Sequence, residues 1–420
     1  MATERFHGIV VGGGAAGFFA AIACAEAKPG CRVIILERGP ECLAKVRISG
    51  GGRCNVTHSC FEPRELVTRY PRGSRELIGP FQRFQPRHTI EWFEKRGVTL
   101  KTEEDGRMFP TTDQSATIID CLTRSAREAG VVVRTSTPVA QVARRVPSGF
   151  SVVLANGQQI DADQLLLATG GSRTRGQGEA AVALGHNLEE PVPSLFTFHV
   201  PVPWLTELAG VSVDPVEVSV PGTKLRERGP MLITHKGVSG PAILRLSAWG
   251  ARELHGRDYR FPLEIRWFPS LNPAGLEQAF EERRTSQGAR RVTNSPMAPL
   301  TARLWERLVA AAGLRRETTW AMMPRDDRAR LVRQLSATTV NVEGKTLNQD
   351  EFVTCGGVRL KEIDFRTMQS RVCPGLYFAG EVLDIDGITG GFNFQAAWTT
   401  GWIAGQSMAA SCAVDAAEGA

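Results

Sequence analysis

The stretch Gly8-Ile-Val-Val-Gly-Gly-Gly-Ala-Ala-Gly17 decides the fold of this chain. An apolar run, Ile9 to Val11, precedes the glycines, as in a buried strand that ends in a turn. In such a turn Gly12 permits the tight bend, Gly14 lets a pyrophosphate approach the backbone, and Gly17 lets the next helix pack close to the strand. The sequence therefore predicts a dinucleotide-binding βαβ unit at the start of the chain.

An acidic residue closes the second predicted strand of this unit. Glu37 ends the run Cys31-Arg-Val-Ile-Ile-Leu-Glu37, 20 residues after Gly17. A carboxylate at this position accepts hydrogen bonds from ribose hydroxyls and disfavours a ribose that carries a phosphate. The predicted helix from about Ala15 to Ala27 directs its N-terminal N–H groups at the diphosphate. We therefore expect FAD or NAD rather than NADP.

Composition limits the class of protein. The chain has 420 residues, of which 42% are hydrophobic, and this suits two or three domains with a large core. No run of sequence approaches the ~20 apolar residues of a membrane-spanning helix. The first strand also begins too early to leave room for a signal peptide. We therefore expect a cytoplasmic protein with no membrane partner.

Cysteines and charge limit the partners. The nine cysteines include no C-x-x-C pair, which is typical of reduced thiols, so neither a disulfide framework nor a metal site is expected. The net charge is +6, and the arginines between Arg283 and Arg333 alternate with acidic residues. This mixture is typical of a solvated helical surface. We expect a small-molecule substrate, the charge pattern disfavours a nucleic-acid partner, and the oligomeric state stays open.

Two further glycine-rich turns are predicted to face the cofactor. The first, Arg47-Ile-Ser-Gly-Gly-Gly-Arg-Cys-Asn-Val-Thr57, offers backbone N–H groups for an anion, and Arg53 adds a guanidinium. The second, Thr169-Gly-Gly171, follows an apolar strand at 163–168, and ligands of open α/β sheets bind at such strand ends. For the first of these turns, a flexible surface loop is the alternative interpretation.

The C-terminal segment Gly375 to Trp398 has the same pattern. A buried strand at 376–379 precedes a glycine and Glu381, and further glycines open a helix near Phe392. The N-terminus of that helix would stabilise negative charge near N1 and O2 of a reduced flavin. Glu381 or Asp386 is placed to hydrogen-bond the ribityl chain. The alternative is a glycine-rich loop that only caps a core helix.

The predicted cofactor is FAD. NAD(P)H is expected at most as a transient substrate, because the sequence has no second Gly-x-Gly-x-x-Gly motif for a separate nicotinamide domain. The predicted FAD-binding residues are Gly12, Gly14, Ala15, Ala16, Gly17, Glu37, Arg38, Lys45, Ser49, Gly50, Gly51, Gly52, Arg53, Cys54, Asn55, Val139, Ala168, Thr169, Gly170, Gly380, Glu381, Asp386, Gly391, Phe392 and Asn393.

The middle of the chain differs from both ends. From Phe196 to Trp267 short apolar runs alternate with Pro/Gly turns, a pattern typical of an antiparallel or barrel-like domain. Pro273 to Leu335 is helical in character, and a strand returns at 338–342. We predict an α/β fold: a Rossmann-like FAD-binding domain at 1–190 and 345–420, an inserted β-rich, barrel-like domain at 191–270 and 336–344, and a helical subdomain at 271–335.

A series of motifs resembles a known family over nearly the whole chain. These motifs are Ile48 to Thr57, Gly106-Arg-Met-Phe-Pro110, Ala168-Thr-Gly-Gly171, Thr234-His-Lys-Gly-Val-Ser-Gly-Pro-Ala242, Val353-Thr-Cys-Gly-Gly-Val358, Thr367-Met-Gln-Ser370 and Gly375 to Gln395. In this order they resemble bacterial aminoacetone-oxidase-like, or NAD(P)/FAD-dependent oxidoreductase, flavoproteins, among them enzymes similar to bile-acid 4-desaturases. The resemblance implies an FAD domain assembled from both ends of the chain, with a β-rich and a small helical domain between them.

The leading functional hypothesis is an FAD-dependent oxidoreductase that transfers hydride between the flavin and a small organic substrate, with NAD(P)H or oxygen as partner. His235 is the candidate catalytic residue, because an imidazole exchanges protons near neutral pH. A histidine that only satisfies local backbone groups is the alternative. Arg359 and Lys361 are candidates for orienting an anionic substrate.

Two other functions stay open. A non-catalytic flavin redox sensor would bind FAD without turnover. An FAD-dependent RNA-modifying enzyme would need an accessible basic surface, for which the sequence offers the arginines at 283, 284, 290, 291, 315 and 316.

Overall fold

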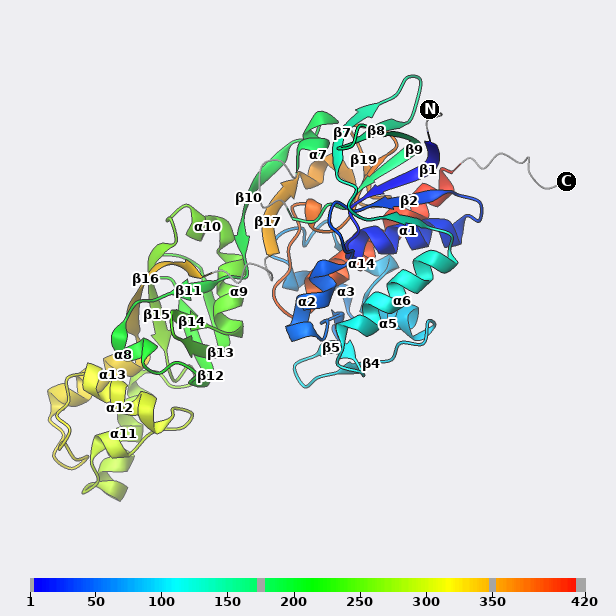
Figure 1. The fold of residues 1–420 in the computed structure, drawn as a ribbon. Helices are drawn as coiled ribbons and strands as arrows, with labels where there is room; N and C mark the ends of the chain where they lie inside the picture. The colour runs from blue at the N-terminus through cyan, green and yellow to red at the C-terminus, as the bar shows by residue number, and fades with distance from the viewer. Residues whose placement is uncertain (1–3, 172–177, 347–352, 413–420) are drawn as a thin grey trace. The chain divides into compact units, whose positions relative to one another are not determined.

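The computed structural model describes residues 4–171, 178–346 and 353–412, and the chain forms two compact units (Figure 1). The first unit combines Met1–Pro193 with Gln349–Ala420, and the second is Ser194–Asn348. Both ends of the chain thus belong to one unit, and the middle forms the other. The domain boundaries drawn from composition, including the separate helical subdomain, stay a prediction.

A nine-stranded sheet forms the centre of the first unit. Its core strand, β1 (Glu4–Val11), pairs in parallel with β2 (Val33–Leu36) and β9 (Gln159–Leu167), and β20 (Leu376–Phe378) extends the sheet beyond β9. All four residues of β2 are buried, as expected for a parallel strand covered on both faces. The remaining strands are β6 (Val132–Arg134), β7 (Val139–Arg144), β8 (Phe150–Leu154), β18 (Ile363–Asp364) and β19 (Gln369–Ser370).

The stretch Ala155-Asn-Gly157, between apolar runs at 151–154 and 159–160, predicts a β-hairpin, and the structure contains it. Strands β8 and β9 pair antiparallel on either side of it, and Gly157 has a φ of +83°, the left-handed region that such a turn requires. The sequence pattern predicts the run at 159–160 and the strand at 163–168 as separate strands, but in the structure they form the single strand β9. It is continuous because it pairs with β1 from Ile160 to Leu167.

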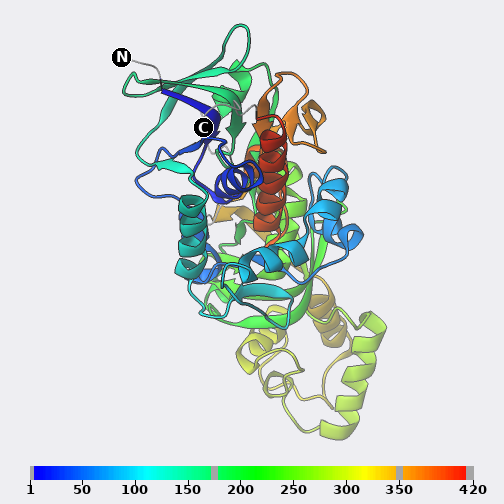
Figure 2. The ribbon, with the colours of Figure 1, turned by 90° about the vertical axis from the view of Figure 1, so that its right-hand side faces the viewer.

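Two helices from opposite ends of the chain pack against each other in the first unit. They are α1 (Ala15–Ala27) and α14 (Phe392–Ala410), which lie side by side in Figure 2. Glycines permit the close approach: a Cβ at Gly401 would lie 2.6 Å from the Ala16 carbonyl oxygen, and one at Gly405 would lie 2.3 Å from that of Ala20. This contact joins the N-terminal and C-terminal segments into one domain.

Shorter elements complete the first unit. The helices are α2 (Ala44–Gly52), α3 (Pro63–Leu66), α4 (Ile78–Arg83), α5 (Pro86–Glu94), α6 (Ser115–Glu128) and α7 (Glu179–Ala183), with single turns η1 (Val67–Arg69), η4 (Leu360–Glu362) and η5 (Gly380–Val382). Strands β3 (Thr57–His58), β4 (Leu100–Thr102) and β5 (Arg107–Pro110) form a small sheet, and β10 (Leu188–Ser194) pairs with β17 (Val353–Val358).

The second unit is a closed barrel with helices, which confirms the predicted barrel-like insert. The strands close in the order β11 (Thr197–His199), β14 (Gly237–Ser239), β13 (Arg226–Thr234), β12 (Ser212–Ser219), β15 (Arg260–Arg266) and β16 (Thr338–Thr346). Its helices are α8 (Pro203–Thr206), α9 (Pro241–Trp249), α10 (Ala251–His255), α11 (Pro273–Gln287), α12 (Ala302–Ala311) and α13 (Arg325–Ser336) with η3 (Val292–Asn294). Along the described ranges we find no helix with the length and apolar character needed to cross a bilayer.

Candidate functional site

The glycine turn after β1 combines tight packing with open space. A Cβ at Gly12 would lie 2.3 Å from the Ala168 oxygen, and one at Gly17 would lie 2.0 Å from the Gly12 oxygen, so the strand, turn and helix leave no room for side chains there. A Cβ at Gly14, in contrast, would meet no atom of the described residues within 4 Å. Since Gly14 precedes the N-terminus of α1, this space suits an anionic group.

Glu37 holds the same turn from the second strand. Its Oε2 accepts a hydrogen bond from the Gly13 N–H at 2.8 Å, and its Oε1 accepts one from the Gly39 N–H at 2.7 Å. Each carboxylate oxygen has capacity for a further donor, such as a ribose hydroxyl. The side chain is therefore positioned at the turn before any ligand binds.

Replacing Glu37 with alanine is expected to weaken FAD binding by about 1–3 kcal/mol, because both the ribose hydrogen bonds and the order of the turn are lost. Titrating the apoprotein with FAD and following flavin fluorescence measures the change. Glu41→Ala is the matched control, since Glu41 is an exposed acid on the same loop. Equal affinities of the two variants would mean that the ribose binds elsewhere.

The segment predicted as a glycine loop begins as a helix. Helix α2 extends to Gly52, but the backbone angles of Ser49, Gly50 and Gly51 are not helical, and φ is +59° at Gly50 and +69° at Gly51. Among the described atoms, none lies within 4 Å of a Cβ built at Gly51 or Gly52. The segment is thus a helix end that unwinds into open backbone, which corrects the expectation of a simple loop.

Arg53 has protein partners of its own. Its Nη1 donates to Glu103 Oε1 at 2.6 Å, and its guanidinium lies 4.0 Å from the centre of the Phe109 ring. A phosphate or a flavin carbonyl would therefore share Arg53 with Glu103. The predicted role of Arg53 toward the cofactor stays a prediction.

The predicted segments at 48–57 and 375–395 come together. With its amide oriented by these neighbours, Asn55 donates to the Thr57 oxygen at 3.1 Å and accepts from the Gly391 N–H at 3.0 Å. Trp398 Nε1 donates to the Val56 oxygen at 2.9 Å, and Thr57 Oγ1 donates to Gln395 Oε1 at 2.6 Å. Two segments more than 300 residues apart in the sequence thus share one hydrogen-bonded surface.

The N-terminus of α14 opens at this surface. Its N-cap is Gly391 in the left-handed region, and within the described ranges no side chain caps the first turn. Asn393 instead holds the preceding turn, because its Oδ1 accepts from the Gly387 N–H at 2.8 Å and its Nδ2 donates to the Gly387 oxygen at 2.9 Å. The first N–H groups of a 19-residue helix, with its positive dipole end, are left for a ligand.

The two acids predicted to bind the ribityl chain have partners in the protein. Glu381 accepts from the Thr354 N–H at 2.8 Å and forms an ion pair with Lys45. Asp386 is fully buried and pairs through both carboxylate oxygens with Arg72. Contact of either acid with FAD stays a proposal, and Asp386 in addition has a clear structural role.

The turn after β9 carries an unpartnered polar group. Thr169 Oγ1 is buried and has no hydrogen-bond partner among the described residues. The neighbouring Gly170 has a φ of +75° and, over the same ranges, no atom within 4 Å of a Cβ position. Because buried hydroxyls are nearly always hydrogen-bonded, the orphaned hydroxyl beside open backbone points to a polar ligand. The residues present therefore fit a dinucleotide such as FAD.

The other predicted site residues are less informative. Ala15 and Ala16 begin α1, Arg38 is exposed, and Val139 begins β7. Cys54 is completely buried, and burial raises the pKa of its thiol to about 12, which favours packing over redox chemistry. His235 belongs to the second unit, where it is exposed at the turn between β13 and β14.

Sequence analysis missed His58, which follows the glycine motif directly. Its ring stacks on Phe392 at the start of α14, with centroids 4.7 Å apart. Its Nε2 lies 3.1 Å from the Asp105 oxygen, and its buried Nδ1 has no partner in the part of the chain that the structure describes. Burial lowers the pKa of His58, so a neutral ring faces the helix N-terminus. Its position directly after the glycine motif Arg47 to Thr57 was the one feature of the sequence that could have indicated it.

A second missed histidine forms a buried network. His186 Nδ1 lies 3.0 Å from Glu362 Oε2, and its Nε2 lies 2.7 Å from Ser370 Oγ. Ser370 Oγ already accepts the Cys373 N–H at 2.7 Å, so its hydroxyl proton faces His186. The order Ser–His–Glu matches hydrolytic triads, but all three side chains are buried. We interpret the network as a structural link between η4 and β19.

Arg359 and Lys361 line a surface depression of about 310 Å³ together with Leu360, Glu189 and Asp384. Arg359 pairs with Glu189 at 2.9 Å. An anionic substrate would have to compete with the two acids for these cations. The depression therefore does not favour the predicted anion-orienting role.

Comparisons with known proteins agree over nearly the whole chain. The profile of the HI0933-like protein Rossmann domain matches residues 6–407. The chain is 32% identical to the ribosomal RNA dihydrouridine synthase of Escherichia coli (strain K12), covering 97% of this chain and 99% of that protein. It is 29% identical to the 3-dehydro-bile acid delta(4,6)-reductase of Clostridium scindens (strain ATCC 35704), covering 95% and 98%.

Among solved structures, the fold is similar to that of 3-ketosteroid-Δ4-(5α)-dehydrogenase from Rhodococcus jostii RHA1. The TM-score is 0.52 over 97% of each chain, and the sequence identity is 15%. At this identity the likeness shows the shared fold alone.

Proposed function

Because this chain belongs to the HI0933-like family of FAD-binding Rossmann proteins and is a flavin-dependent oxidoreductase, we propose that it reduces a carbon–carbon double bond conjugated to a carbonyl group. Forming dihydrouridine saturates the uracil bond next to a carbonyl, and a delta(4,6)-reductase saturates bonds conjugated to the 3-oxo group. The shared chemistry is addition of a hydride to one carbon and a proton to the other.

The observation that supports this function is the surface formed by the uncapped N-terminus of α14 and the segment that follows the open backbone of Gly51 and Gly52, which Asn55 joins to Gly391. When bound, FAD supplies the hydride chemistry. The chain's own part is to bind and orient. Gly14 leaves space for the diphosphate of FAD, and Thr169 offers it a hydroxyl group. The N–H groups at the start of α14 would favour negative charge on the flavin ring.

Ribosomal RNA is the substrate that one further observation favours over a small enone. Five of the six arginines suggested by the sequence are exposed in the second unit, namely Arg284, Arg290, Arg291, Arg315 and Arg316. Ion pairs with Glu281 and Glu306 offset two of these charges. Arg283 differs, because it is partly buried near the Trp320 ring and burial lowers its pKa. The other three charges provide a surface for phosphates.

One experiment separates the substrates. The FAD-loaded protein is mixed with NADPH or NADH and either ribosomal RNA transcribed in vitro or a 3-oxo-Δ4 steroid, and products are measured by mass spectrometry. Dihydrouridine in the RNA supports the RNA substrate, and a saturated steroid supports the small enone. Flavin reduction by the nicotinamide with no product from either would contradict the proposed reaction and favour the redox sensor.

His235→Asn tests the proposed proton donor. Because His235 is exposed at a turn, the variant should fold normally, bind FAD and accept hydride from NAD(P)H at the wild-type rate. Transfer to the substrate should slow by roughly 10²–10⁴-fold, the usual contribution of general acid catalysis. Stopped-flow measurement of the two half-reactions tests this split, with the neighbouring Lys236→Met as control. Equal slowing of both half-reactions would contradict the assignment.

A further inference from the structure

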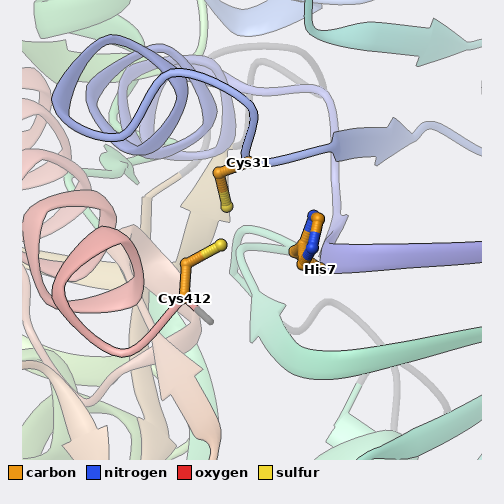
Figure 3. Close-up of side chains that lie close together, drawn as sticks. All are labelled: His7, Cys31 and Cys412. Atoms are coloured by element: carbon orange, nitrogen blue, oxygen red, sulfur yellow. The ribbon is translucent and has the colours of Figure 1, made fainter. Parts of the chain in front are cut away.

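Three side chains with metal-binding atoms lie together in the first unit (Figure 3). They are His7 of β1, Cys31 just before β2 and Cys412 just after α14, and their ligand atoms all lie within 4.8 Å of one another. The two sulfur atoms point toward each other, with the imidazole beside them. A third thiol, Cys24 of α1, is close by: its Sγ lies 3.8 Å from Cys31 Sγ.

This cluster is separate from the dinucleotide site. Gly8 pairs with Val33, the first residue of β2, so His7 and Cys31 lie at the amino end of the paired strands. The glycine turn follows Val11, at the opposite ends of the same strands. A ligand held by the cluster would therefore not touch the FAD-binding turn.

We propose that Cys31, Cys412 and His7 bind one thiophilic divalent metal ion of the zinc type, which joins the first strand, the second strand and the last helix. Thiolate and imidazole are the ligands that such ions prefer. Two ligand atoms of a tetrahedral ion with ~2.3 Å bonds lie about 3.8 Å apart, so the ligand atoms of these three side chains, all within 4.8 Å of one another, are close enough to share one ion. A water molecule would complete the coordination.

Charge balance supports this ligand set. Cys31 and Cys412 each lose a proton when the ion binds, and the two thiolates with a neutral imidazole neutralise the double positive charge.

His7 is expected to form the weakest of the three bonds. Its Nδ1 accepts the Arg32 N–H at 2.9 Å, so the neutral ring carries its proton on Nε2. Binding through Nδ1 displaces that hydrogen bond directly, and binding through Nε2 requires the ring proton to move to Nδ1, so the Arg32 hydrogen bond is lost in either case. His7 is only partly buried, while Cys31 and Cys412 are each 8% exposed. An ion would therefore enter the cluster from solvent past His7.

The test uses the FAD-loaded protein in a phosphine reductant. After treatment with a chelator it is titrated with Zn²⁺, or with Cd²⁺, whose thiolate complexes absorb in the ultraviolet. We expect one metal per chain by elemental analysis after gel filtration, cadmium–thiolate absorption, and a higher melting temperature. No such absorption, or no retained zinc, in the wild-type protein would overturn the proposal.

Variants locate the site. Cys31→Ser and Cys412→Ser should lose the metal, His7→Ala should weaken binding at least tenfold, and Cys60→Ser, a control with a similarly buried thiol outside the cluster, should bind normally. If the serine variants fail to fold, Zn²⁺ must protect Cys31 and Cys412 of the wild-type protein from alkylation, as mapped by peptide mass. Unprotected thiols, or full binding by both serine variants, would overturn the assignment.

Discussion

Gly14→Leu is expected to give a folded protein that no longer retains FAD. Gly14 has an extended backbone, with φ of −91° and ψ of −171°, so a side chain causes no backbone strain. A Cβ there meets no atom within 4 Å in the described part of the chain, so the side chain should not disturb the fold. It would instead fill the space assigned to the pyrophosphate. Flavin absorbance per chain after purification, with circular dichroism to verify folding, measures the result.

Two other glycines serve as controls for this prediction. Gly79→Leu places the same side chain at an exposed glycine of α4 that also has open space, and it should keep its flavin. Gly17→Leu should fail to fold, because its Cβ would lie 2.0 Å from the Gly12 oxygen. If Gly14→Leu retains full flavin content, the assigned pyrophosphate contact is wrong, whatever the effect at Gly17.

Local patterns predicted the central sheet and the insert because those elements depend on near neighbours in sequence. The apolar runs of β1 and β2 and the spacing of Gly12 and Gly17 specify a βαβ unit within about thirty residues. The Asn156-Gly157 turn likewise specifies its own hairpin. The helical start of α2 was missed because the glycines that follow it indicate a loop, whereas Ala44 to Ile48 are helical and the backbone leaves the helical conformation only from Ser49.

Contacts between distant segments left no local signal. His7, Cys31 and Cys412 show no C-x-x-C spacing, and only the packing of α14 on α1 brings Cys412 to the amino end of the sheet. His186 and Glu362 are separated by 176 residues, so the sequence around the histidine contains no sign of its acidic partner. Asp386 was predicted as a cofactor ligand from its place in a glycine-rich segment, but its partner Arg72 is 314 residues away.

Arg72→Met is expected to destabilise the first unit by about 3–5 kcal/mol, because it leaves the carboxylate of Asp386 buried without its main cation. The Asp386 side chain has no exposure and that of Arg72 has 11%. Arg72 and Asp386 also pair through their backbones, which joins residue 72 to the segment before α14. The two segments pack closely there, because a Cβ at Gly73 would lie 2.6 Å from the Ile385 side chain. Urea unfolding of the flavin-free protein, followed by circular dichroism, measures the change.

Two comparisons make this result specific. Arg366→Met breaks a pair with Asp364 in which the arginine side chain is 84% exposed, and it should leave the stability nearly unchanged, because exposed ion pairs contribute little. The double variant Arg72→Met/Asp386→Leu should recover part of the lost stability, since removing both charges avoids an unpaired buried carboxylate. If Arg72→Met costs no more than Arg366→Met, the carboxylate reaches water or another cation, and Asp386 again becomes available as a ligand for the ribityl chain. If the cost is large and the double variant recovers, Asp386 serves the fold, and Glu381 is left as the acid for that role.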